Sequence, residues 1–160
     1  MPPAQCVVVA ASTGGPTALQ VVVSGLPVGL PAAVLVVPHI PRGFTKSLAE
    51  RLDARSAIPV REARDGMIVE PGTILIAPAG IHARLARRGG AAVVVLDEEP
   101  RDALDRPSAD VLMASAAEVY GSLAMGVVRT GMGSDGTEGL RAIREKGGLT
   151  LAEAEETCVI

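Results

Sequence analysis

Ser12, His39 and Asp135 each come shortly after an apolar segment of the 160-residue chain. A serine hydroxyl becomes a nucleophile when an imidazole takes its proton, and a carboxylate fixes the tautomer of that imidazole and stabilises its charged form. In open α/β sheets, ligands bind at the carboxyl ends of the strands. These three residues therefore predict a nucleophile, a base and an orienting carboxylate at one edge of a sheet.

Each of the three residues also has a structural interpretation. A serine before a helix is ordinarily an N-cap, and Ser12 precedes two glycines and a helical pattern. A histidine at a strand end is commonly structural. An aspartate in a glycine-rich loop, such as Asp135, commonly stabilises a turn through its side chain. His82 competes with His39 as the base, but it opens a predicted hairpin rather than ending a parallel strand. Placement at one edge of one sheet is what favours the triad.

Familiar motifs of other enzyme classes are missing. The sequence contains no G-x-S-x-G, and the order Ser, His, Asp differs from the Ser, Asp, His order of α/β-hydrolases. No Gly-Lys-Ser/Thr follows Gly14 and Gly15, so a Walker A loop is excluded, and "ASTGGP" is not a dinucleotide fingerprint.

The elements that must position the three residues are predicted by apolar runs. Continuous runs rich in β-branched residues indicate strands buried on both faces, at 6–11, 32–38, 73–77 and 123–128. Residues 81–97 read as two strands joined at Arg88-Gly89-Gly90, a hairpin.

Helical patterns alternate with these runs. A short helix is predicted from Pro16 to Gly25, and others at 106–121 and 137–148. Within 43–55, Phe44, Leu48 and Leu52 recur four residues apart and predict one apolar stripe. Strand, helix, strand at this spacing indicates βαβ units. The prediction is an α/β fold: a doubly wound, mostly parallel sheet with helices on both faces and an antiparallel hairpin.

Composition limits the class of protein. The length suits one domain, and a net charge of −3 gives no basic footprint for nucleic acid. No apolar stretch approaches a membrane span, and "MPPAQ" lacks the features of a signal peptide. Cys6 and Cys158 show no metal-ligand or CxxC spacing. We therefore expect a cytoplasmic, monomeric α/β domain that uses no metal or organic cofactor and does not insert into a membrane.

Six separated motifs, in order from about residue 6 to the end, resemble the catalytic domain of the chemotaxis protein-glutamate methylesterases of the CheB type. They are "VVVAASTGGPTAL", "LVVPHIPRGFTKSLAERLD", "REARDG", "ILIAPAGIHARL", "RPSADVLMASAAEVYG" and "GVVRTGMGSDGTEGL". The resemblance implies a doubly wound α/β fold with a Ser-His-Asp triad. It implies hydrolysis of glutamate methyl esters on the cytoplasmic helices of chemoreceptors, with release of methanol, and in some members deamidation of receptor glutamines.

By position, the resemblance makes Ser12 the nucleophile in "AASTGG", His39 the base in "HIPRGF" and Asp135 the carboxylate in "TGMGSDG". It puts Thr13 and the backbone amide of Met132 near the substrate oxyanion.

The sequence departs from the family at three places. Arg129 replaces an aliphatic residue before "TGMG", and Asp105 stands where members usually have His. The chain also stops where members continue for a further helical segment. We expect residues 1–5 to form a disordered stub and residues 6–160 to form the catalytic domain without that C-terminal segment. The resemblance also implies a regulatory receiver domain in a full-length protein.

Two other functions fit the same residues. One is a serine esterase or amidase that acts on other substrates. The other is a non-catalytic binding module in which "STGG" forms an anion nest at a helix N-terminus.

Overall fold

The computed structural model describes residues 4–11, 15–129 and 134–153 of the chain. Its centre is a six-stranded sheet in which all five strand pairs are parallel. From one edge to the other the strands are β3 (Val60–Glu62), β4 (Ile74–Ile76), β2 (Ala33–Pro38), β1 (Cys6–Ala11), β7 (Ala124–Val128) and β8 (Leu149–Ala152). A separate antiparallel pair forms the hairpin, β5 (His82–Arg88) with β6 (Ala91–Asp97).

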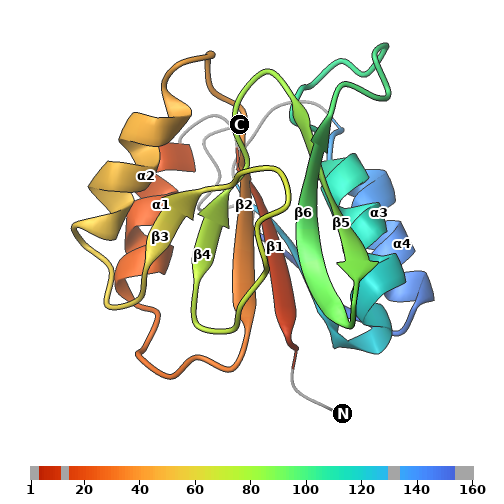
Figure 1. Cartoon of the computed structure of the whole chain (residues 1–160), viewed down its shortest axis with the longest axis horizontal. Helices are drawn as coiled ribbons and strands as arrows, with labels where there is room; N and C mark the ends of the chain where they lie inside the picture. The colour runs from red at the N-terminus through yellow and green to blue at the C-terminus, as the bar shows by residue number, and fades with distance from the viewer. Residues whose placement is uncertain (1–3, 12–14, 130–133, 154–160) are drawn as a thin grey trace.

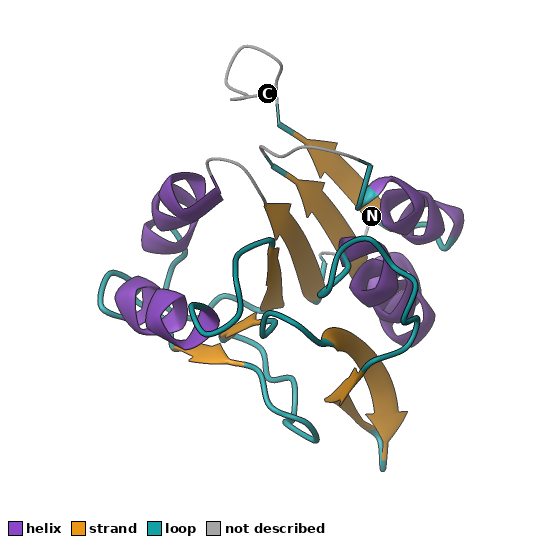
Figure 2. Cartoon of the chain, turned by 90° about the horizontal axis from the view of Figure 1, so that it is seen from above, coloured by secondary structure: helices purple, strands orange, loops and turns teal. Residues whose placement is uncertain are grey.

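Helices cover both faces of the sheet. The α-helices are α1 (Gly15–Ser24), α2 (Thr45–Asp53), α3 (Ala109–Tyr120) and α4 (Thr137–Glu145), and a 3₁₀ turn, η1 (Gly121–Leu123), follows α3. Figure 2, seen from above, shows helices on both sides of the sheet: α1 and α2 pack on one face, and α3, α4 and the hairpin pack on the other. No helix within the described ranges combines the length and the apolar character that crossing a membrane requires.

Alternate residues of the central strands enter two different cores. Val8 and Ala10 of β1 belong to the core under α3, α4 and the hairpin, whereas Val9 and Ala11 belong to the core under α1 and α2. Both cores are built almost wholly from Ala, Val, Leu, Ile and Met side chains. The two-sided burial explains why the strand sequences are continuously apolar rather than alternating.

The predicted fold class is confirmed, and the four predicted parallel strands and the hairpin are found to within one or two residues. The sequence reading missed β3 and β8, the strands at the two edges of the sheet. The prediction of an apolar stripe within residues 43–55 was wrong for one of its three residues. Leu48 and Leu52 are buried in α2, but Phe44 precedes the helix and is 60% exposed.

The sheet reverses its direction of growth at β1. The chain proceeds from β1 to β2 on one side, and later elements add β7 and β8 on the other side. Ligand sites in doubly wound sheets form at the carboxyl ends of the strands beside such a reversal. The carboxyl ends of β1, β2 and β7 therefore lie side by side at this edge.

Candidate active site

The register of the central strands brings the ends of β1 and β2 together. Ala11 pairs with Pro38, and the backbone N–H of His39 donates to the carbonyl oxygen of Ala11 at 3.1 Å. Ser12 follows Ala11 in the sequence. Ser12, Thr13 and Met132, which were predicted as nucleophile and oxyanion-binding residues, lie outside the described residues.

The structure does bring the other two predicted triad members together. His39 Nε2 and Asp135 Oδ2 are 2.8 Å apart, and their side chains are only 15% and 7% exposed. With Nε2 donating to the carboxylate, Nδ1 is the ring nitrogen left to accept a proton. The hydrogen bond from His39 to Asp135 raises the pKa of His39, burial opposes this, and the charges of Asp105 and Asp135 raise it further.

Asp135 is held by four donors. Its Oδ2 accepts from His39 and from the backbone N–H of Ala109 at 2.6 Å, and its Oδ1 accepts from Ser108 Oγ at 2.9 Å and from Asp110 N at 3.0 Å. Burial alone would raise the pKa of Asp135, but these hydrogen bonds outweigh it and lower the pKa to about 2. The carboxylate is therefore charged at neutral pH and fixed at the N-terminus of α3, where the helix dipole also favours an anion.

Helices α3 and α4 exchange caps around this carboxylate. While Asp135, just before α4, binds the first turn of α3, Asp110 of α3 binds the start of α4. Asp110 Oδ1 accepts from Gly136 N at 2.9 Å and from Gly139 N at 2.7 Å. Burial raises the pKa of Asp110. Because the two aspartates depend on each other's helix, the position of Asp135 is tied to how closely α3 and α4 pack.

That packing requires Gly139, and its substitution gives a stability prediction. A Cβ at residue 139 would lie 2.6 Å from Met113 Cβ and 3.2 Å from Asp110 Cα. We expect Gly139→Ala to lower the free energy of unfolding by about 1–3 kcal/mol, because neither atom can move without moving α3. Denaturant unfolding would measure it, with Gly25→Ala as the control.

Gly25 is a suitable control because a Cβ there would lie 3.6 Å from its nearest neighbours, the carbonyl oxygens of Val21 and Val22, which is ordinary contact. Gly25→Ala should change the free energy of unfolding by less than about 1 kcal/mol. Equal losses in the two variants would mean that the close approach of α3 to α4 does not restrict the side chain at residue 139.

His82, the competing base, has a structural place. It is fully buried at the start of β5, its Nε2 donates to the carbonyl oxygen of Pro100 at 2.9 Å, and its Nδ1 accepts from Ser108 N at 3.2 Å. Both ring nitrogens are thus occupied. His82 tethers the hairpin to Ser108, which in turn donates to Asp135, and it is not free to serve as a base.

Two further side chains were singled out by the sequence. Arg129 directly follows β7, and its guanidinium lies 3.7 Å from the Glu153 carboxylate, which offsets its charge. Asp105 offers a carboxylate oxygen within 4.8 Å of both a ring nitrogen of His39 and an oxygen of Asp135. The roles of Ser108 and Asp110 were missed.

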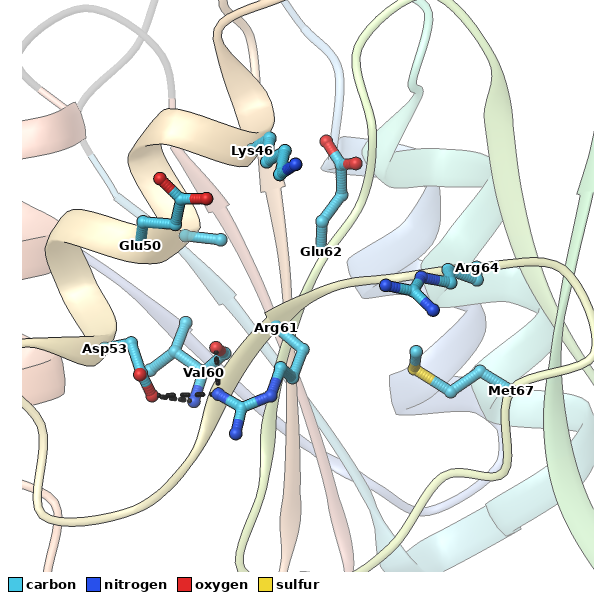
Figure 3. Close-up of a pocket in the computed structure, with 9 residues that line it drawn as sticks. Lys46, Glu50, Asp53, Val60, Arg61, Glu62, Arg64 and Met67 are labelled. Carbon is cyan, nitrogen blue, oxygen red and sulfur yellow. Dashed lines mark hydrogen bonds and ion pairs between the residues drawn. The ribbon is translucent and has the colours of Figure 1, made fainter.

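The hollow that Figure 3 draws is a different place. It has a volume of about 560 Å³ and lies between α2 and the edge strand β3. The positive and negative charges among its lining residues are equal in number. The charged residues are Lys46, Arg61, Arg64, Glu50, Asp53 and Glu62. Asp53 is already bonded there to Val60 N and to Arg61. This hollow is not lined by His39, Asp105 or Asp135. The candidate site is therefore identified by the proximity of these three side chains to one another, and not by a pocket.

Known proteins of one family are similar to this chain over nearly its whole length. The sequence model of the CheB methylesterase family matches residues 7–160. A protein-glutamate methylesterase/protein-glutamine glutaminase of Nitratidesulfovibrio vulgaris is 47% identical over 154 residues, which are 96% of this chain and 42% of the relative. The counterpart from Archaeoglobus fulgidus is 43% identical over 97% of this chain and 44% of its own length. This chain therefore spans less than half the length of these curated relatives.

A solved structure shows the same fold. The crystal structure of the Thermotoga maritima CheB methylesterase catalytic domain superposes with a TM-score of 0.95 at 43% sequence identity, covering 99% of this chain and 84% of that one. The family match extends over nearly the whole sequence, and the structural match includes the strands, helices and hairpin described above. The chain belongs to the CheB methylesterase family.

Proposed function

We propose that this chain is a serine hydrolase that removes methyl esters from glutamate side chains of chemoreceptor cytoplasmic helices and releases methanol. The observation that carries the proposal is the partly buried His39–Asp135 pair, beside the carboxyl end of the strand that Ser12 follows. The names of the curated relatives support the same reaction.

The mechanism follows from which nitrogen of His39 is free. Ser12 Oγ attacks the ester carbonyl and its proton passes to His39 Nδ1, while Nε2–H stays bonded to Asp135. The charged imidazole is stabilised by the ionised carboxylate. In this proposal Thr13 and the amide of Met132 hold the oxyanion. His39 returns the proton to the departing methanol, and water hydrolyses the glutamyl-serine ester by the same route. The residues invoked need no metal or organic cofactor.

A second activity is supported by the relatives' names, which include protein-glutamine glutaminase. The same acylation releases ammonia from a glutamine amide in place of methanol from an ester. We therefore propose that the chain also deamidates receptor glutamines.

The cellular setting forms part of the proposal. We propose a cytoplasmic catalytic domain, spanning residues 6–160, that acts as a monomer on the receptor. The curated relatives are more than twice as long as their matched part. Their length supports a regulatory receiver domain elsewhere in the full protein.

The test is methanol release from a methylated receptor cytoplasmic fragment, with ammonia release from its glutamine form measured in parallel. A generic ester such as p-nitrophenyl acetate serves as the comparison substrate. Release of methanol from the receptor fragment supports the proposal. Turnover of the generic ester alone would favour a serine esterase with other substrates. No turnover, and no labelling by a fluorophosphonate that modifies reactive serines, would favour the anion-binding module.

A further inference from the structure

A third carboxylate stands beside the His39–Asp135 pair. Asp105 belongs to the loop between β6 and α3, which lies at the same edge of the molecule as the carboxyl ends of the parallel strands (Figure 1). His39, Asp105 and Asp135 each present one atom such that all three atoms lie within 4.8 Å of one another. All three residues are partly buried, so water screens their charges less than it would on an open surface.

Among the described residues, Asp105 has no neighbouring cation that pairs with its charge. In the parts of the chain that the structure describes, no arginine or lysine forms an ion pair with it. The arginines around the site are engaged elsewhere. Arg42 donates to the carbonyl oxygen of Gly80, Arg106 donates to the carbonyl oxygen of Arg101, and Arg129 faces Glu153.

Asp135 is the charged group that bonds to His39. Asp135 comes from the loop before α4, and Asp110, on α3, bonds to Gly136 and Gly139. The positive charge that can form at the site among the described groups is therefore the His39 imidazolium, which would face two carboxylates. Opposite charges at this separation favour the charged form of each partner.

We propose that Asp105 is a positioning residue for the proposed hydrolase, whose carboxylate acts beside Asp135 to stabilise the protonated His39 imidazole formed when Ser12 loses its proton. The catalytic part of this inference rests on the proposed function. The electrostatic part concerns His39 alone and can be measured without turnover.

The direction of the effect is fixed by charge. The hydrogen bond to Asp135 is the main cause that raises the pKa of His39, and the charge of Asp105 adds to it. Without the Asp105 charge the pKa of His39 should fall, so the acid limb of kcat/KM should move to lower pH. The plateau of kcat/KM should also fall, by about three- to tenfold, because the imidazolium formed in the transition state loses a partner.

The experiment uses the fact that the chain has only two histidines. The ¹³Cε1–¹H NMR signals of His39 and His82 can be followed against pH, with His39→Gln to assign them. Variants Asp105→Asn, Asp105→Glu and Asp102→Asn are compared with the wild type. Asp102 is the control, because it lies on the same loop, is exposed, and its loss changes the net charge equally. The Asp105 side chain makes no hydrogen bond to other described residues, so Asp105→Asn should fold normally; thermal unfolding checks this.

We expect the His39 midpoint to move down in Asp105→Asn, to stay near the wild-type value in Asp105→Glu, and to be unchanged in Asp102→Asn. The acid limb of kcat/KM should move with it. An unchanged midpoint in Asp105→Asn, or equal shifts in the Asp105 and Asp102 variants, would overturn the proposal. A midpoint that moves as expected in a protein without esterase turnover would instead contradict the proposed function and keep the electrostatic inference.

Discussion

Ser12→Ala is expected to lower methanol release from a methylated receptor fragment by at least about 10⁴-fold, because no acyl-enzyme can form without the hydroxyl. Hydrogen-bond donors and substrate binding alone give only a small residual rate. Cys6 cannot substitute as nucleophile, since it is fully buried in β1 and burial raises the pKa of its thiol to about 12. Turnover under substrate saturation, together with fluorophosphonate labelling detected by mass, measures the loss.

Ser134→Ala is the matched control. Ser134 precedes Asp135 in the same loop and is exposed, and none of the triad roles falls on it. The control variant should keep wild-type turnover and be labelled by the fluorophosphonate, whereas Ser12→Ala should lose both. A folded Ser12→Ala protein that keeps turnover within about tenfold of the wild type would place the nucleophile at another residue.

The central strands and the four helices could be predicted because their signals are local. Both faces of β1 and β2 are buried, so almost every residue is apolar, and Gly or Pro stands near most helix ends. β3 has only three residues, of which one is buried, and the residues of β8 are mostly exposed. Such short edge strands exist because a neighbouring strand offers its hydrogen-bonding groups, which is information their own sequence does not carry.

The candidate site likewise contains residues that the sequence predicted to lie together and residues that it did not. His39 and Asp135 could be predicted because each follows a recognisable strand, and parallel strands end at one edge. Ser108 and Asp110 were missed as partners of Asp135, because those contacts join residues 25 to 27 positions apart through the meeting of α3 and α4. Asp105 was noted only as an unusual residue. Its nearness to His39 depends on the path of a loop that no periodicity describes.

The reciprocal caps explain how a buried carboxylate is kept charged and oriented in a small domain. A carboxylate that only paired with His39 would be pushed toward its neutral form by burial. The first turn of α3 supplies backbone N–H groups that need an acceptor in any case. The orienting carboxylate therefore also completes a helix N-terminus, so the geometry of the site is supported by the same bonds that stabilise the α3–α4 pair.

Asp135→Asn is expected to lower kcat by about 10⁴-fold, because the charge that stabilises the His39 imidazolium is lost and the tautomer is no longer fixed. It should also lower the free energy of unfolding by about 1–3 kcal/mol. In either orientation the asparagine NH₂ faces a backbone N–H, that of Ala109 or that of Asp110, where the aspartate offered an acceptor. Turnover and denaturant unfolding measure the two losses separately.

Ser108→Ala separates the two effects. It removes one donor to Asp135 and the N-cap acceptor for Val111 N, yet it leaves the carboxylate charge and the bond to His39. We expect a stability loss of about 1 kcal/mol and a fall in kcat of less than about tenfold. If both variants lost activity in proportion to stability, Asp135 would act only through folding.

The stability difference between wild type and Asp135→Asn should depend on pH in a defined direction. The pKa of Asp135 is about 2 in the folded protein and 3.8 for an unperturbed aspartate. Its contribution to stability is therefore fully present above about pH 4 and is lost as the pH falls toward 2, where the protonated carboxyl resembles the amide. Unfolding measured from pH 7 to pH 2 should show the two curves converging in that window. Curves that stay parallel would mean that Asp135 is not bound in its charged form by the start of α3, and the account of its orientation would fail with it.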